Sequence, residues 1–258
     1  MLKVGLKLWS TNIALAEHVR QAFSRGEIDF LELYVVPGTV PGCGAYWHGL
    51  GGPVVLHAPH FGHGFNLADP LLRSENRNFF YESQMFADRL KSSHIVVHGG
   101  NGGCLEEAID QLRGLNEPRV ALENKPLRGI NGKECIGYSV AQIRQIMRCC
   151  NLNKFILDLN HAVHAARSLQ AEPLEFLGTF FGLNPIGYHL ADGDPGSETD
   201  AHMDLGQGQM PLLKMVSLLE DGAAVTLETP LNIENGIGDF LRNRAVLINL
   251  IKKGCRYE

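Results

Sequence analysis

Residues 154–176, KFILDLNHAVHAARSLQAEPLEF, contain one complete strand-and-helix unit and decide the fold class. The first six residues are apolar apart from Lys154 and Asp158, as is typical of a parallel strand buried on both faces. Residues 162–176 then space their apolar side chains along one face of a helix, and we predict a single helix there. A buried strand followed directly by an amphipathic helix is the repeating unit of α/β proteins.

The same unit recurs eight times along the chain. The predicted strands are residues 4–9, 30–35, 54–58, 94–99, 119–124, 154–159, 186–191 and 224–229. Helices are predicted at 12–24, 70–90, 105–115, 140–150, 162–176, 212–219 and 237–252. Residues 37–52 are too rich in Gly and Pro for a long regular helix and are read mostly as loop. Eight units in 258 residues predict one (β/α)8 barrel domain, a TIM barrel, over residues 1–258. An open doubly wound sheet is the alternative, but KLWSTN at the end of the first strand carries no dinucleotide glycine fingerprint.

Composition and charge limit the classes of function. The formal net charge is −5, so the chain has no overall attraction for a phosphate backbone. The N-terminal residues lack the pattern of a signal peptide, and no uncharged apolar run is long enough to span a bilayer. We therefore expect a cytoplasmic protein without a membrane partner. The six cysteines lack CxxC spacing and are read as reduced thiols rather than zinc ligands.

Six of the predicted strands end in a side chain that can bind a metal ion. These are His57, His98, Glu123, Asp158, His189 and Glu228. In a parallel barrel the strand ends share one face, where catalytic residues are found. A carboxylate that ends a buried strand needs a cation or strong hydrogen-bond donors to replace its hydration. Basic residues are scarce at these strand ends, with Lys125 alone close to them, so the sequence predicts metal ions as the compensating charge.

Two loop segments extend this set to nine side chains. His161 follows Asp158 by three residues across a strand-to-helix turn, and Asp200 and His202 alternate around Ala201, so each pair is expected to face one pocket. Imidazole with carboxylate suits zinc, manganese or iron. One ion takes about four to six ligands, so nine indicate two or three ions. Weaker candidates for substrate contact are His60, His63, Lys125 and Arg128, and His164 is expected at the surface.

The order of the motifs resembles the endonuclease IV family (AP endonuclease family 2) within the xylose isomerase-like barrels. The motifs are LHAPHFGHGFNL (56–67), VVHGG (96–100), ALEN (121–124), ILDLNHA (156–162), YHLAD (188–192), TDAH (199–202), GQG (206–208) and LETP (227–230). The resemblance runs from about residue 54 to 230, and all nine ligand positions of that family have a counterpart.

The resemblance implies a trinuclear zinc site. One ion takes His57, His98 and Glu123, and a second takes Glu123 as a bridge with Asp158, His189 and Glu228. The third takes His161, Asp200 and His202. Related sugar isomerases and epimerases share Glu123, Asp158, His189 and Glu228 as a one-metal site. The TDAH pair and the two histidines His57 and His98 resemble the three-metal branch.

The sequence departs from the endonuclease family in its front loops. GLKLWSTN (5–12) replaces a Gly-x-His-x-Ser segment, and VVPGTVPG (35–42) replaces an aromatic-basic loop. His60 and Phe61 stand where the family carries a tyrosine-leucine pair that enters the DNA stack. Together with the acidic net charge, these changes weaken the case for abasic DNA as substrate and leave the metal chemistry intact.

Three functions follow from these observations. The first is metal-assisted hydrolysis of a phosphoester, including cleavage of DNA at abasic sites, in which Glu123 bridges the ions and Glu228 orients the nucleophile. The second is a one-metal sugar isomerase or epimerase in which Glu123 and Glu228 transfer protons. The third is a barrel that keeps its metals for structure alone or serves as a binding partner.

Overall fold

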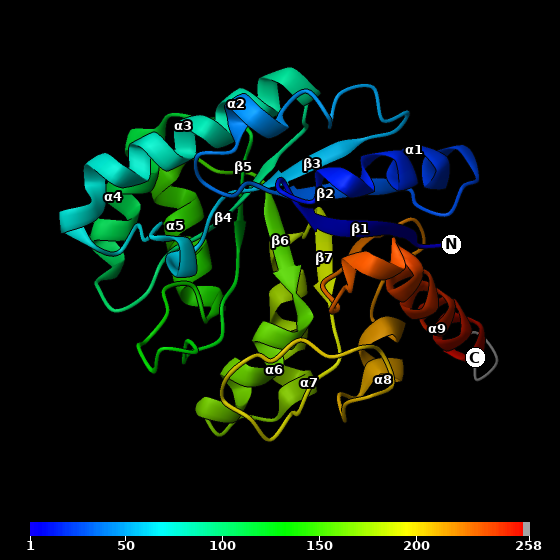
Figure 1. Ribbon diagram of the computed structural model, residues 1–258. Coiled ribbons are helices and arrows are strands. Elements are labelled where there is room, and N and C mark those ends of the chain that lie inside the picture. The colour runs from blue at the N-terminus through cyan, green and yellow to red at the C-terminus, as the bar shows by residue number, and fades with distance from the viewer. Residues whose placement is uncertain (255–258) are drawn as a thin grey trace.

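Eight parallel strands close into a barrel in chain order in the computed structural model, and helices cover its outside (Figure 1). The structure describes residues 1–254. The strands are β1 (Lys3–Trp9), β2 (Phe30–Tyr34), β3 (Val54–His57), β4 (Ile95–His98), β5 (Val120–Glu123), β6 (Phe155–Asp158), β7 (Gly187–Leu190) and β8 (Ala224–Leu227). The predicted TIM barrel is confirmed, and the open sheet is wrong because β1 also pairs with β8.

The seven predicted helices lie close to their predicted places, with one correction, and a further helix of four residues stands in the segment read mostly as loop. The observed helices are α1 (Ala16–Ser24), α2 (Val40–Cys43), α3 (Arg73–Leu90), α4 (Leu105–Leu115), α5 (Val140–Cys150), α6 (Leu159–Ser168), α7 (Pro173–Phe180), α8 (Leu212–Ser217) and α9 (Gly238–Gly254). The single helix predicted at 162–176 is wrong, because Gln170 adopts a left-handed φ of 57° and ends α6. Pro173 lacks an N–H to continue the helix and instead opens α7, which Glu172 caps by accepting from the Glu175 N–H at 2.7 Å.

The register of the strands sets the height of the site. Lys7 is paired with Glu32, His98 with Glu123 and Asp158 with His189, so these side chains leave neighbouring strands at the same level. Side chains two residues apart share a face of a strand. The residues two positions before His98, Glu123 and Asp158 form a separate buried apolar cluster, Val96, Ala121 and Ile156. The polar strand ends therefore lie directly above a layer of buried apolar side chains.

Residues 37–52 pack onto the barrel rather than over its opening. Trp47 and Leu50 are buried in the core, and Trp47 Nε1 donates a hydrogen bond of 2.9 Å to the Ser10 carbonyl oxygen. All of residues 37–52 are described, and none of them lines the cavity at the strand ends.

Two further expectations from the sequence concern the cysteines and membrane-spanning helices. Cys43, Cys104, Cys135, Cys149 and Cys150 are free thiols, as predicted, and Cys255 lies outside the described residues. None of the helices within residues 1–254 combines the length and the apolar content needed to cross a bilayer.

Candidate metal centre

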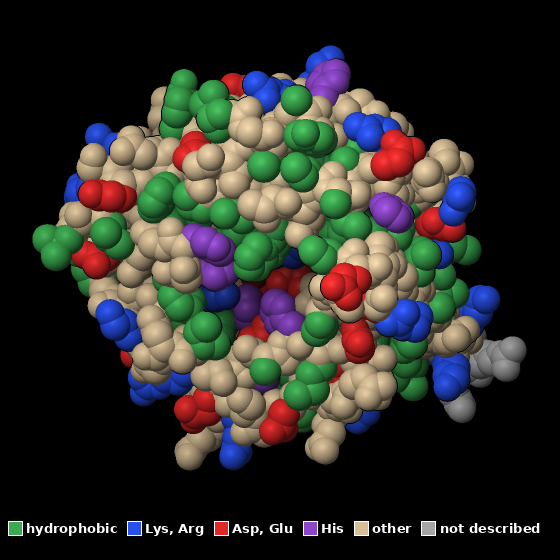
Figure 2. All heavy atoms as spheres, viewed as in Figure 1, with side chains coloured by type: hydrophobic (Ala, Val, Ile, Leu, Met, Phe, Trp, Pro, Cys, Tyr) green, Lys and Arg blue, Asp and Glu red, His purple; other side chains and the backbone are tan. Residues whose placement is uncertain are grey.

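A cavity of about 480 Å³ opens at the carboxyl ends of the strands. Figure 2 shows histidine and acidic side chains at the bottom of this hollow. Seven of the nine predicted ligands line it, namely His57, His98, Glu123, His161, Asp200, His202 and Glu228. Asp158 and His189 are buried and contact members of this set. The structure thus brings all nine side chains together, and their role as metal ligands stays a prediction.

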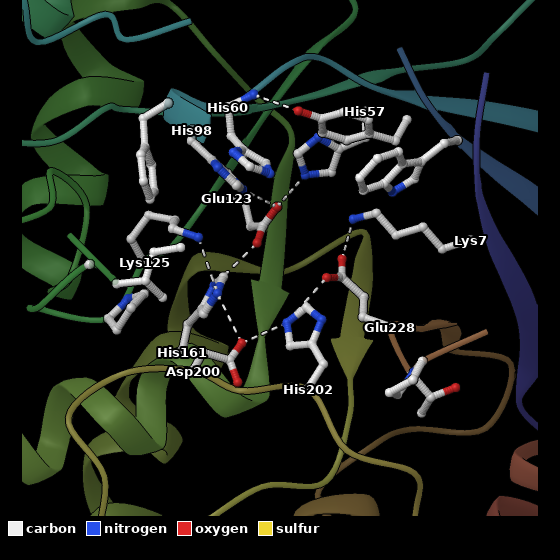
Figure 3. A pocket seen from close by; sticks show the side chains of 18 of the residues that line it. Lys7, His57, His60, His98, Glu123, Lys125, His161, Asp200, His202 and Glu228 are labelled. Carbon is white, nitrogen blue, oxygen red and sulfur yellow. Dashed lines mark hydrogen bonds and ion pairs between the residues drawn. The ribbon is translucent and has the colours of Figure 1, made fainter. Parts of the chain in front are cut away.

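The carboxylate of Glu123 is the centre of the arrangement. Its Oε2 lies 3.2 Å from His57 Nε2, 2.9 Å from His98 Nε2 and 3.5 Å from His189 Nδ1. Its Oε1 lies 3.2 Å from His161 Nδ1. Burial alone would raise the pKa of Glu123, but the imidazoles of His98 and His189 outweigh it and hold the pKa well below its usual value. Four histidines from four segments therefore meet one ionised carboxylate, and Figure 3 shows three of them, His57, His98 and His161.

Backbone carbonyls orient two of these histidines. His57 Nδ1 lies 2.6 Å from the Ala58 carbonyl oxygen, and His161 Nδ1 lies 2.9 Å from that of Asn124. Because a carbonyl oxygen can only accept, Nδ1 carries the proton in both rings. In the neutral imidazole the Nε2 lone pair then faces the cavity, which is the orientation that a metal ligand requires.

His161, Asp200 and His202 form a second group at the edge of the cavity. Asp200 Oδ2 lies 2.7 Å from His202 Nε2 and 3.4 Å from His161 Nε2. Asp158 caps α6 by accepting from the His161 N–H at 2.7 Å and also lies against the His161 ring, with 3.5 Å between Oδ2 and Nδ1. Burial opposes a charge on His161, but the carboxylates of Asp158, Asp200 and Glu123 together outweigh it and raise the pKa of His161 to about 10.

The loop that carries Asp200 and His202 is tied to the end of β7 by Asp192. The backbones of Asp192 and Met203 exchange hydrogen bonds of 3.1 and 3.0 Å. The Asp192 carboxylate accepts from the N–H groups of Gly206 at 2.8 Å and Met210 at 3.1 Å. Gly208 packs so closely on Gly193 that a Cβ there would lie 2.4 Å from its carbonyl oxygen. The GQG segment is therefore explained by loop packing.

Glu32, His189 and Glu228 form a third group, which the sequence predicted only in part. His189 bridges two carboxylates, with Nε2 2.9 Å from Glu32 Oε2 and Nδ1 2.6 Å from Glu228 Oε1. Thr226 Oγ1 donates a hydrogen bond of 2.7 Å to the same Glu32 oxygen. Burial would lower the pKa of His189, but Glu32 and Glu228 outweigh it and raise the pKa well above its usual value.

Lys7 corrects the expectation that Lys125 is the one basic residue near the strand ends. Lys7 Nζ lies 3.1 Å from Glu32 Oε1 and forms an ion pair with Glu228 (Figure 3). Burial disfavours its charge, but the carboxylates of Glu228 and Glu32 outweigh burial and raise the pKa of Lys7 further above its ordinary value. The ammonium group therefore compensates part of the negative charge that the sequence analysis assigned wholly to metal ions.

Several polar atoms of these groups converge without forming hydrogen bonds. Neither carboxylate oxygen of Asp200 has a hydrogen-bond partner of acceptable geometry among the described residues, although three imidazoles surround it. His189 Nδ1, which lies beside Glu228, likewise has no hydrogen-bond partner of acceptable geometry among the described residues. These side chains belong to the groups that could hold a metal ion, and a bound ion would satisfy the atoms that lack a partner.

The balance of charge also fits bound cations. Five carboxylates gather in these groups, from Glu32, Glu123, Asp158, Asp200 and Glu228. Within the described part of the chain, Lys7 and Lys125 are the lysines that line the cavity. The raised pKa values of His161 and His189 mean that these imidazoles compensate the carboxylates together with Lys7 when no metal is bound. A divalent ion held by the same side chains would take the place of their protons.

The weaker candidates divide into three groups. His60, Lys125 and Arg128 line the cavity, as expected for substrate contact. His63 lies behind the cavity wall, where its Nδ1 is 2.8 Å from the Tyr34 hydroxyl. The expectation that His164 is at the surface is wrong, because it is fully buried with Nε2 3.4 Å from Asp200 Oδ1. Its Nδ1 is held by the Ser197 carbonyl oxygen at 2.9 Å.

Lys7 and Glu32 are the site residues that the sequence analysis missed. Each stands inside an apolar strand, in KVGLKLW and FLELY, whereas the predicted ligands end a strand or lie after one. A charged side chain in the middle of a buried strand is as costly as one at its end. That signal was present in the sequence and would have found both residues.

Comparison with known proteins supports the architecture. A family profile described as "Xylose isomerase-like TIM barrel" matches residues 46–244. No curated protein matches the sequence. The fold is similar to that of a D-tagatose 3-epimerase-like protein. The two structures have a TM-score of 0.70 and 21% sequence identity, and the match covers 97% of this chain and 99% of the other.

Two further structures share the fold. A Thermus thermophilus protein from crystals soaked with ZnCl2 has a TM-score of 0.62, 20% identity and coverage of 95% of this chain and 97% of that one. A xylose isomerase domain protein from Alicyclobacillus acidocaldarius has a TM-score of 0.59, 16% identity and coverage of 98% of both chains. At these identities the likeness extends to the fold. The profile match spans most of the barrel, and the chain therefore belongs to the xylose isomerase-like TIM barrel family.

Proposed function

We propose that this protein is a metal-dependent phosphoester hydrolase of the endonuclease IV type. The observation that carries the proposal is the position of Glu123, whose carboxylate lies within 3.5 Å of His57, His98, His161 and His189. A carboxylate shared by several imidazole groups is suited to bridge two ions. His161, Asp200 and His202 provide a further set of donors within 4.8 Å of one another. Nine donors around one cavity favour two or three zinc ions over one.

The chain's own residues would divide the work of hydrolysis. Bound divalent ions lower the pKa of water and neutralise charge on the phosphoryl oxygens. Glu228, which contacts Lys7 and His189, would orient the attacking water and accept its proton. The water oxygen forms a bond to phosphorus while the bond to the leaving oxygen breaks. The leaving oxygen keeps that electron pair and takes up a proton.

Metal content and phosphodiester cleavage together test the proposal. We expect close to three zinc ions per chain by elemental analysis, and hydrolysis of bis(p-nitrophenyl) phosphate or of a duplex with an abasic site. His202→Ala should lose about one ion, and Glu228→Gln should lower kcat by about 100-fold or more. His48→Ala is the matched control, because His48 is exposed and does not line the cavity. A fully metallated wild type that cleaves neither substrate would reject the proposal.

A sugar isomerase or epimerase is the second candidate. It is favoured by the size of the cavity, about 480 Å³, and by the two carboxylates Glu123 and Glu228, which both contact the His189 ring. Two carboxylates on one bound sugar could act as the bases of a proton transfer. One manganese or cobalt ion per chain, with interconversion of ketoses that Glu228→Gln abolishes, would favour this function over hydrolysis.

A further inference from the structure

The cavity has different walls on its two sides. Trp9 ends β1 and Lys125 follows the end of β5 by two residues, and both line the cavity. β1 and β5 are four strands apart in a closed barrel of eight, so they stand on opposite sides of the opening. Figure 3 shows Lys7, which also belongs to β1, and Lys125 on opposite sides of the donor groups. An aromatic wall on the β1 side thus faces a cationic wall on the β5 side.

The cationic wall is free to bind an anion. Lys125 Nζ lies 3.1 Å from His161 Nε2, which places the ammonium group beside the metal donors. Arg128 lines the same wall. Neither side chain is within ion-pair distance of a carboxylate of residues 1–254. A cation without an anionic partner, next to a set of metal ligands, suits an oxygen of a phosphoryl group.

The aromatic wall is held in place and remains accessible. Trp9 is 49% exposed although it lies at the end of a barrel strand. Its ring is supported by Tyr34 and His63, with centroids 5.7 and 5.5 Å away. The Tyr34 hydroxyl in turn lies 2.8 Å from His63 Nδ1, which fixes both supporting rings. An indole that is fixed and half exposed at a cavity wall is a platform on which a planar ring can stack.

The surface around the opening does not suit a nucleic-acid duplex. Figure 2 shows mainly hydrophobic and uncharged side chains around the hollow, with no broad basic patch on this face of the described chain. Among the described residues that line the cavity, the basic ones are Lys7, Lys125 and Arg128, and Lys7 is already paired with two carboxylates. Duplex binding draws most of its affinity from many phosphate contacts. A cavity of about 480 Å³ has the size of a small-molecule site.

We infer that the substrate is a small phosphoester that carries a planar ring, of nucleoside size, and is not duplex DNA. The phosphoryl group would lie between the donor groups and Lys125, and the ring would stack on Trp9. This inference rests on the proposed hydrolase function and specifies its substrate class.

Paired inhibitors isolate the contribution of the ring. Thymidine 5′-phosphate carries a base where 2-deoxyribose 5-phosphate carries its anomeric hydroxyl, and both can compete with bis(p-nitrophenyl) phosphate in the metal-loaded full-length enzyme. We expect thymidine 5′-phosphate to inhibit about tenfold more tightly, the effect of one stacking contact. Trp9→Ala should make the two inhibition constants equal, and Trp9→Phe should keep most of the difference. Tyr46→Ala is the matched control, because Tyr46 is also 49% exposed and does not line the cavity.

The possible outcomes separate this inference from the proposed function. Equal inhibition constants in the wild type, or a preference that survives Trp9→Ala, would overturn the ring platform. A higher kcat/KM for an abasic duplex than for bis(p-nitrophenyl) phosphate would overturn the substrate class while hydrolysis stands. If neither phosphodiester is cleaved, the hydrolase function fails and this inference fails with it.

Discussion

Replacing Glu32 by Gln should weaken metal binding without a large loss of fold stability. Glu32 Oε2 accepts from His189 Nε2 at 2.9 Å and from Thr226 Oγ1 at 2.7 Å. The carboxylate holds a proton of His189 on Nε2, so that Nδ1 is the nitrogen that faces Glu228 and would become the ligand when a metal ion replaces its proton. Glutamine has nearly the same volume, but its amide can turn an N–H toward the ring and stabilise the wrong tautomer.

The size of the effect follows from the role of such partners. Loss of a carboxylate that orients a ligating histidine typically lowers metal affinity by about 10- to 100-fold. That range corresponds to about 1.4 to 2.7 kcal/mol of binding free energy. Lys7 keeps Glu228 as a counter-ion in the variant, so the metal-free protein should stay folded.

Competition with a zinc chelator of known affinity measures the change at equilibrium, and thermal unfolding of the metal-free protein checks the fold. Thr226→Val is the control, because it removes one hydrogen bond to the same oxygen and leaves the negative charge. We expect Thr226→Val to change zinc affinity by about threefold at most. Unchanged zinc binding in Glu32→Gln, or an equally large loss in Thr226→Val, would refute the proposed orientation of His189.

Three further changes test other parts of the structure. Lys7→Met leaves two buried carboxylates without their cation, so the metal-free protein should lose about 3 to 5 kcal/mol of stability in urea unfolding. Zinc should restore part of this stability in the variant. If zinc has no effect on the stability of the variant, the metal site is contradicted. Trp47→Ala should cost about 3 to 5 kcal/mol, because the indole is fully buried, and a cost under about 1 kcal/mol would show that residues 37–52 are not part of the core. Hydrogen bonds from Arg119 lower the pKa of Glu117 from 4.5 to about 2. The stability that Glu117 contributes is therefore present above pH 4.5 and lost as the pH falls through about 2, so the gap between wild type and Glu117→Gln should close over that range, and a constant gap would contradict it.

Much of the fold follows from local pattern. Each of the eight strands is a short apolar run, and a buried parallel strand needs little more than that to be recognised. α4 and α5 begin and end as their periodicity predicts. The pattern missed the break between α6 and α7, because apolar spacing continues through a segment whose course is set by Gln170 and Pro173.

The grouping of the polar residues depends on which strands become neighbours. Six of the nine predicted ligands could be read from strand ends because closure of a parallel barrel brings those ends to one face. Pairing within the set could not be read in this way. His189 faces Glu32, which is 157 residues away, and Lys7 reaches Glu228 across the seam where β1 meets β8.

The sequence by itself determined the repeat of strand and helix and the kinds of donor at the strand ends, since both are local properties of the chain. Tertiary structure alone decided that Glu123 is shared by four histidines, that Lys7 stands among the carboxylates, and that Trp9 faces Lys125 across the opening. Those relations come from the closure and register of the barrel, which place distant segments side by side and which no local pattern encodes.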